Sequence, residues 1–276
     1  MLIQFVKVTH AYQQPTGQIT ALEGIDMGFH RGEFVAVLGP SGAGKSTLLL
    51  HFNGLLRPTS GQVLYKHRDI HAKGNNLKAL RSDVGLLFQT PENNFFGQTV
   101  FEDISYGPVN HGLKGSAVEN AVDRALEQVG LSLKFKARSP FSLSGGEKRK
   151  VALAGILATE PKVLVLDEPL AGLDAKGKAS LMELLQDLNR QGITVIMVTH
   201  DLAETLPAVS RIVVLAQGKV QVDGSARDIL ADFDFEAWNL ETPELIKLGR
   251  RLGLTFQGNL VATEEEAVQA ILARKR

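Results

Sequence analysis

The sequence predicts an α/β fold built on a parallel sheet, and three observations support this prediction. Short, continuously apolar segments such as "FVAVL" and "VLVL" alternate with helical patterns, as buried parallel strands and their crossover helices do. One of these segments leads through a glycine-rich loop directly into a helix. Segments near the N-terminus instead alternate apolar and polar residues, which is typical of half-buried strands.

The same patterns place the individual elements along the chain. We expect strands at 2–8, 25–29, 34–38, 62–66, 84–89, within 162–169, at 194–200 and at 211–217. A helical pattern runs from Thr99 to about Thr159, and a further helix is expected at 176–190. The tail beyond Ser225 changes character and is predicted to hold helices at 227–232, 243–252 and 263–276. Thr263 and Glu266 would form a capping box at the start of the last helix.

The composition fits an ordinary globular protein and argues against several functional classes. The 276 residues suffice for one large α/β domain with attachments or for two small domains. Thirty basic residues balance thirty acidic ones, whereas nucleic-acid-binding proteins usually show a basic excess, so we expect no nucleic-acid partner. Cysteine is absent, which excludes a disulfide framework and a thiolate metal site. No signal-peptide pattern and no apolar run of ~18 residues occurs, so we expect any membrane role to come through a partner.

A phosphate-binding loop is the strongest motif in the chain. The stretch "GPSGAGKST" follows an apolar strand and precedes a helix, so it matches the P-loop in both pattern and context. Its backbone N–H groups would wrap a β-phosphate, Lys45 would neutralise β- and γ-oxygens, and Ser46 would bind Mg²⁺. We therefore expect a nucleotide site formed by Gly39, Ser41, Gly42, Gly44, Lys45, Ser46 and Thr47.

Two carboxylates end the apolar strand in "VLVLDEP". Successive strand side chains point apart, so Asp167 and Glu168 are not expected to share one task. Asp167 suits the Mg²⁺ shell, and Glu168 suits polarising an attacking water. A pair of helix-capping carboxylates is the alternative, but the P-loop earlier in the chain argues against it.

Three further side chains are candidates because of where their segments end. His200 closes an apolar strand; such a histidine is more often structural, but the carboxyl edge of a parallel sheet is where ligands bind. Gln89 ends another strand, where its amide would touch Mg²⁺ or water, or would simply be a polar strand terminus. Tyr12 precedes the P-loop and would stack on adenine, unless it is a partly buried core residue.

A second anion-binding signal lies in "SLSGGEKRK", residues 142–150. Ser144 would cap a helix with Glu147 as its capping-box partner, yet two glycines fill the first helical positions. Three cations follow near the positive end of the helix dipole, where isolated helices disfavour them. Glycine N–H groups and positive charge suit a phosphate better than they suit local helix stability.

These motifs, taken in order, resemble the nucleotide-binding domain of ATP-binding-cassette (ABC) proteins. The resemblance rests on "GPSGAGKST", Gln89, "LSGGE", "VLVLDEP", "AGLD" and His200, and it covers residues 1 to about 225. It implies a P-loop, RecA-like ATP-binding core, a helical signature subdomain and a C-terminal helical extension. The implied boundaries are 1–88 with 161–225 for the core, 89–160 for the subdomain and 226–276 for the extension.

The family resemblance also implies why two phosphate-binding elements occur in one chain. Two ABC domains pair head to tail, so that Ser144, Gly145 and Gly146 of one copy would contact the γ-phosphate of ATP on the other's P-loop. Asp174 would lie at the seam, and the activity would be hydrolysis of ATP with Mg²⁺. The fifth signature residue is commonly glutamine, whereas Glu147 stands here. A carboxylate facing phosphate would repel it, so we expect Glu147 to turn back to the helix cap.

Residues 88–113 indicate what such a dimer would drive. Phe95, Phe96, Phe101 and Tyr106 belong either to the core of the helical subdomain or to a surface groove for a partner's helix. The stretch resembles that of energy-coupling-factor ATPases, and residues 48–63 resemble the cobalt-transport branch, although Asn94 replaces the usual glutamine. The tail is similar to the C-terminal helices through which those ATPases pair; a helical lid over the sheet edge is the alternative.

By this resemblance the chain is the ATP-hydrolysing subunit of an energy-coupling-factor importer, bound peripherally at the cytoplasmic face of the cell membrane. Its partners would be a transmembrane coupling protein, a substrate-binding membrane protein and a second ATPase copy, either identical or related. The expected cargo is a transition-metal ion, cobalt before nickel; the alternatives are a vitamin or another nutrient, or a soluble ABC ATPase without a transport role. A P-loop kinase or GTPase would lack the "LSGGE" helix.

Overall fold

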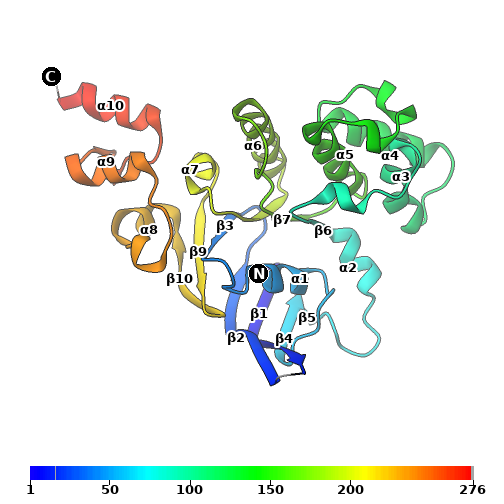
Figure 1. Ribbon diagram of the computed structural model, residues 1–276, viewed down its shortest axis with the longest axis horizontal. Helices are drawn as coiled ribbons and strands as arrows, with labels where there is room; N and C mark the ends of the chain where they lie inside the picture. Colours follow the sequence, from blue (N-terminus) through cyan, green and yellow to red (C-terminus); the bar gives the residue numbers. More distant parts are fainter. Residues whose placement is uncertain (16, 275–276) are drawn as a thin grey trace.

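The computed structural model describes residues 1–15 and 17–274, and a six-stranded sheet lies at its centre (Figure 1). The strand order is β10-β9-β3-β8-β7-β6; β6, β7, β8, β3 and β9 run parallel, and β10 is an antiparallel edge strand. The predicted parallel sheet is therefore confirmed. The bounds are β3 Phe34–Leu38, β6 Val84–Leu87, β7 Val163–Asp167, β8 Thr194–Val198, β9 Arg211–Ala216 and β10 Lys219–Ser225.

Both faces of this sheet are covered, because alternate residues of each strand enter two different apolar cores. In β3, Ala36 and Leu38 belong to one core, while Val35 and Val37 belong to the other. The first core is completed by the helices α3 to α6, and the second by α1 and an antiparallel sheet. This double coverage explains the continuously apolar sequence of the parallel strands.

The antiparallel sheet has the strand order β2-β1-β4-β5 and contains the N-terminal strands predicted from alternation. The bounds are β1 Ile3–Gln14, β2 Gly17–Phe29, β4 Ser60–Tyr65 and β5 Arg68–Asp69. β1 and β2 are longer than predicted because they pair with each other as far as Gln14 and Gly17, where exposed residues show no apolar alternation.

The helices α3–α5 and α8–α10 gather at opposite ends of the molecule, with α6 and α7 between them (Figure 1). α3, α4 and α5 gather at one end, where the sequence predicts a helical stretch from 99 to 159. α2 and the single-turn α7 were not predicted, because neither has enough apolar residues for a period to show. The bounds are α1 Lys45–Phe52, α2 Leu77–Asp83, α3 Val100–Asn110, α4 Ser116–Gln128, α5 Gly145–Leu157, α6 Ala175–Arg190 and α7 Leu202–Thr205, with 3₁₀ turns η1 Pro91–Asn94, η2 Leu133–Ala137 and η3 Pro140–Ser142.

The C-terminal segment lies at the opposite end from α3–α5 (Figure 1). The expected helices are present, but a short hairpin between the last two was not predicted, since two-residue strands carry no periodicity. The bounds are α8 Ala226–Asp232, η4 Glu236–Trp238, α9 Glu244–Leu252, β11 Thr255–Phe256, β12 Asn259–Leu260 and α10 Glu264–Arg274. The predicted helix at 263–276 includes residues 275 and 276, which lie outside the described ranges.

The capping interaction of α10 differs from the predicted box. The Thr263 hydroxyl accepts a hydrogen bond from the Glu266 N–H at 3.2 Å, as expected. The Glu266 carboxylate, however, accepts from the N–H of Ala262 at 2.8 Å, one residue earlier than the box requires. No helix within residues 1–15 and 17–274 has the length and apolar character needed to cross a membrane.

Candidate functional site

The P-loop joins the carboxyl end of β3 to α1, and its glycines are required by close packing. A side-chain carbon at Gly39 would overlap the backbone oxygen of Leu215, and one at Gly44 would overlap that of Ala21. Gly44 also has φ +100° at the start of α1, a conformation that residues with a Cβ rarely adopt. Gly42 has φ +79° but open space around it, so only its backbone conformation requires glycine. Ser41 is exposed on the same loop.

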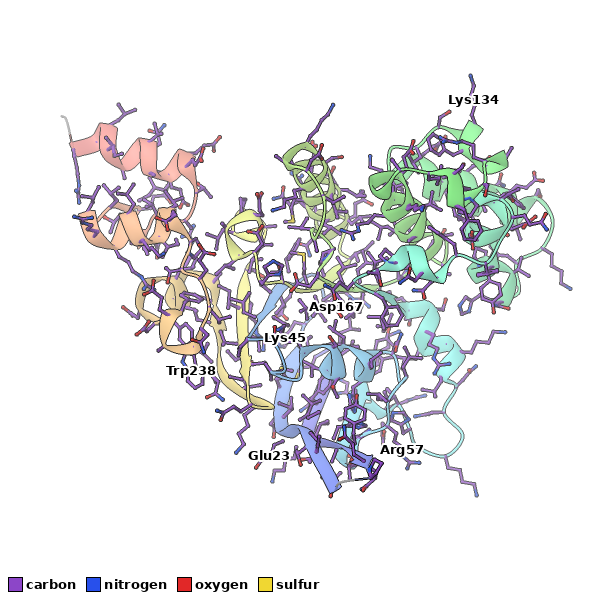
Figure 2. All side chains as sticks on the ribbon, viewed as in Figure 1. Glu23, Lys45, Arg57, Lys134, Asp167 and Trp238 are labelled. Atoms are coloured by element: carbon purple, nitrogen blue, oxygen red, sulfur yellow. The ribbon has the colours of Figure 1, made fainter. Side chains whose placement is uncertain are left out.

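Lys45 occupies the first position of α1, with its ammonium folded over the loop. Its Nζ donates hydrogen bonds to the carbonyl oxygens of Gly39 at 2.6 Å and Pro40 at 3.0 Å. Burial lowers the pKa of Lys45, while the negative charges of Glu168 and Asp167 act in the opposite direction. The ammonium therefore lies within the electrostatic reach of both predicted carboxylates, and Figure 2 shows Lys45 and Asp167 in the centre of the molecule.

Ser46 and Asp167 meet across the gap between α1 and β7. The Ser46 hydroxyl donates to Asp167 Oδ2 at 3.2 Å, so two oxygen donors of the type that Mg²⁺ prefers lie together. Burial raises the pKa of Asp167, and the charge of Glu168 raises it further. A divalent cation would offset this cost, so the donor set fits a Mg²⁺ ion whose remaining ligands are phosphate oxygens and water.

Glu168 follows β7 in a backbone conformation that is unusual for a residue with a side chain. Its φ is +46°, and its N–H donates to the Val198 carbonyl at 2.9 Å, which fixes the turn against β8. The carboxylate accepts from His200 Nδ1 at 2.8 Å, so Nδ1 carries the hydrogen of this contact. Asp167 and Glu168 thus contact different partners, as the strand alternation predicts. β8 ends at Val198, so His200 lies two residues beyond the strand that it was predicted to close.

Gln89 and Tyr12 are two predicted site residues that lie outside the contacts among Lys45, Ser46, Asp167, Glu168 and His200. β6 ends at Leu87, so Gln89 is not the strand terminus that was predicted; it is exposed, and among the described residues its side chain makes no hydrogen bond. Tyr12 lies on β1, and its hydroxyl is 3.2 Å from the Thr47 hydroxyl of the P-loop helix. The fold therefore brings Tyr12 to the P-loop and leaves the side chain of Gln89 without a hydrogen-bond partner among the described residues.

The start of α5 has the predicted cap. The Ser144 hydroxyl accepts from the Glu147 N–H at 3.4 Å, and the Glu147 carboxylate accepts from the Ser144 N–H at 2.8 Å and its hydroxyl at 2.9 Å. The hydrogen bonds from Ser144 lower the pKa of Glu147, so the carboxylate stays charged within the cap. Glu147 is thus turned back as expected. Apart from its chain neighbours and the backbone of its own helix, nothing lies within 4 Å of where a side-chain carbon at Gly145 would be, so the first turn of the helix has an open approach.

Comparisons with known proteins identify the family to which this geometry belongs. The family model described as "ABC transporter" matches residues 22–171. The energy-coupling factor transporter ATP-binding protein EcfA2 of Symbiobacterium thermophilum is 43% identical over 276 residues, covering 98% of this chain and 96% of the relative. The chain belongs to the ABC transporter family. Within it, the chain is an ATPase subunit of the energy-coupling-factor type.

Two solved structures support the same assignment at the level of the fold. The structure of cbiO1 from Clostridium perfringens, described as part of the ABC transporter complex cbiONQ, aligns with a TM-score of 0.75 and 36% identity, covering 90% of this chain and 98% of that chain. The ATP-binding cassette MJ0796, a dimer in a post-hydrolysis state with ADP and Pi, aligns with a TM-score of 0.74 and 31% identity, covering 82% and 99%. The ABC ATPase fold and ATP as its ligand are therefore established for this chain.

Asp174, the predicted seam residue of this ABC ATPase, caps a helix. It precedes α6, and its Oδ1 accepts from the Gly177 N–H at 2.8 Å. Helix capping was the alternative considered for Asp167 and Glu168, but the residue that caps the helix after β7 is Asp174. Asp174 is exposed, which leaves its other oxygen available to a partner.

Arg149 is a site residue whose role the sequence did not predict. It was grouped with Lys148 and Lys150 as a cation near phosphate, but it is only 8% exposed and faces the interior of the chain. Its guanidinium donates to the carbonyls of Pro169 at 2.8 Å and Gln89 at 3.3 Å, as well as to Ala171. One side chain of α5 therefore holds the segments that follow β6 and β7. The buried stripe at Leu153 and Leu157, spaced four residues apart, extends back to position 149 and would have indicated the buried face.

The position of Lys45 predicts the effect of removing its charge. Lys45→Ala should weaken Mg-ATP binding by about a hundredfold or more, because phosphate oxygens lose a partly buried counter-ion. Calorimetric titration of the purified subunit measures this directly. Lys134→Ala, a change of the same type at the outer edge of the molecule (Figure 2), is the matched control and should bind normally. Equal affinities for ATP in both variants would contradict the assignment of the site.

Proposed function

We propose that this ATPase works as a head-to-tail dimer, with each ATP held on one P-loop and covered by the first turn of α5 from the other copy. The observation that carries the proposal is the pair of phosphate-binding elements in one chain. Within the described residues, the N–H groups of Gly145 and Gly146 have no acceptor, and the approach to Gly145 is open. These N–H groups and the helix dipole suit a γ-phosphate oxygen supplied by the second copy.

The contacts at the sheet edge support a division of labour in hydrolysis. Ser46, Asp167 and Gln89 would complete the Mg²⁺ shell together with phosphate oxygens and water. Glu168 would polarise the attacking water, and His200 would hold that carboxylate in place through Nδ1. Asp174 would contact the second copy at the seam, and Tyr12 would stack on adenine.

A groove between the sheet edge and α3–α5 supports a role in membrane transport. Two adjoining hollows of about 300 Å³ and about 600 Å³ share Leu86, Phe88, Gly155 and Ile156 as lining residues. Phe96 and Tyr106 stand at their rims, 61% and 56% exposed, with ring centroids 4.8 Å apart. Phe95 and Phe101 instead pack partly buried against the core. The aromatic stretch thus divides between the two roles considered, and we assign the exposed pair to docking of a helix from the coupling protein.

The remaining assignments concern partners, location and cargo. The chain would bind peripherally at the cytoplasmic face of the membrane, in contact with a transmembrane coupling protein that works with a substrate-binding membrane protein. The intact sequence motifs favour two identical competent sites and hence a homodimer. Residues 48–63 resemble the cobalt-transport branch, so we propose a transition-metal cargo, cobalt before nickel. These residues lie in the second part of α1, in the turn that follows and in the start of β4. Selection of the cargo itself would fall to the membrane partners.

Glu168→Gln tests the dimer with ATP at its interface. The substitution keeps the shape of the side chain but removes the charge that polarises water, so hydrolysis should fall by about a thousandfold while ATP still binds. The variant should then run as a stable dimer on a sizing column with Mg-ATP and as a monomer with Mg-ADP. Glu160→Gln, an exposed glutamate after α5 that pairs with Arg124, should hydrolyse ATP normally. A hydrolysis-deficient Glu168→Gln protein that remains monomeric with ATP would refute the arrangement.

Phe96→Ala tests the docking groove. The isolated subunit should hydrolyse ATP within about twofold of the normal rate, since Phe96 makes no contact with the P-loop in the structure. Recovery of the subunit with detergent-solubilised coupling protein should fall by about tenfold, because exposed aromatic side chains often dominate interface energies. Phe141→Ala, equally exposed at 60% but outside the groove, should retain normal recovery. Normal recovery of Phe96→Ala would place the docking surface elsewhere.

A further inference from the structure

Tyr12 is held beside the P-loop by more than its own hydroxyl. Its ring is 39% exposed, and its hydroxyl meets the Thr47 hydroxyl at 3.2 Å. Behind it lies His10, two residues earlier on β1, with ring centroids 4.7 Å apart and planes inclined by 74°. This edge-to-face geometry is attractive between aromatic rings. The pairing of β1 with β2 shifts register on both sides of His10, and such irregularities redirect side chains.

His10 rests in turn on a histidine of the P-loop helix. The rings of His10 and His51 lie 4.8 Å apart at 78°, and His51 belongs to α1. His51 Nδ1 faces the backbone oxygen of Thr47 at 2.7 Å, and His10 Nδ1 faces that of Arg57 at 3.1 Å. Since a carbonyl oxygen only accepts, both histidines donate from Nδ1. Tyr12, His10, His51 and Thr47 therefore form a closed set of contacts that links β1 to the P-loop helix α1.

His51 is neutral in this set of contacts. Its side chain is fully buried, and burial lowers its pKa to about 4, with the neighbouring imidazoles of His10 and His71 acting in the same direction. A neutral, buried imidazole gives His10 an uncharged ring to pack against. His10 itself is only 8% exposed, so the ring that contacts Tyr12 is itself enclosed by its neighbours.

We infer that His10 is a positioning residue for nucleobase binding: its ring, supported by His51, holds Tyr12 ready to receive the adenine ring. The inference rests on the proposed stacking of adenine on Tyr12. A tyrosine near the exposed end of a two-stranded ribbon would otherwise lose rotamer freedom when the base binds, which weakens affinity. With His10 in place that freedom is already lost in the free protein, so the adenine part of ATP binds a ring that is already oriented.

Substitutions at His10 distinguish the effect of its aromatic ring on ATP affinity from the effect of its hydrogen bond to the Arg57 carbonyl. His10→Ala should weaken Mg-ATP binding about fivefold, the size expected for loss of one aromatic pair. His10→Phe keeps an aromatic edge without the Arg57 contact and should restore affinity to within about twofold, whereas His10→Gln keeps a polar side chain without a ring and should not. Calorimetric titrations with Mg-ATP and with Mg-tripolyphosphate provide the measurement. Affinity for tripolyphosphate, which has no base, should stay unchanged in all three variants.

His71→Ala is the matched control, because His71 lies in the same histidine group but contacts the Leu56 carbonyl at 3.1 Å and makes no ring contact with Tyr12. It should bind ATP normally. Normal ATP affinity in His10→Ala, or an equal loss for ATP and tripolyphosphate, would overturn the inference; the second result would mean that His10 acts on the P-loop itself. Tyr12→Ala, titrated in parallel, tests the stacking of adenine separately from the role of His10. It should weaken ATP binding even if His10 does not position the ring.

Discussion

The proposed head-to-tail arrangement depends on the backbone N–H groups of Gly145 and Gly146 at the start of α5, which remain without an acceptor in the described chain. The capping interaction of Ser144 and Glu147 occupies both of these side chains and turns the carboxylate away from the two glycine N–H groups. What is left is a small, positively polarised surface with an open approach at Gly145. In the proposed dimer the P-loop of one copy would hold the phosphates that the first turn of α5 from the other copy covers.

The sheet edge is organised so that movements of its segments are linked. Glu168 adopts a strained backbone conformation that the Val198 carbonyl and the His200 ring hold in place. Arg149 ties the segment after β7 to the backbone of Gln89, next to the proposed docking groove. If a membrane partner binds in the groove, a displacement there would reach the residues after Asp167 through one buried guanidinium on α5.

Local features could be predicted from the sequence, and tertiary ones could not. The P-loop, the cap formed by Glu147 and the opposed carboxylates depend on neighbours a few residues away, so pattern and spacing were sufficient. The roles of Arg149 and His10 depend on contacts between distant segments, and a single sequence does not show which segments meet. Strand ends at Gln89 and His200 were placed two residues too late, because apolar runs do not show where pairing stops.

The most direct test of the head-to-tail arrangement is a structure of the Glu168→Gln variant with Mg-ATP bound. The account predicts that the N–H groups of Gly145 and Gly146 lie within about 3 Å of oxygens on the γ-phosphate whose β-phosphate is held by the other copy's P-loop. A nucleotide-loaded structure in which these glycines lie far from every phosphate, in either copy, would contradict the account.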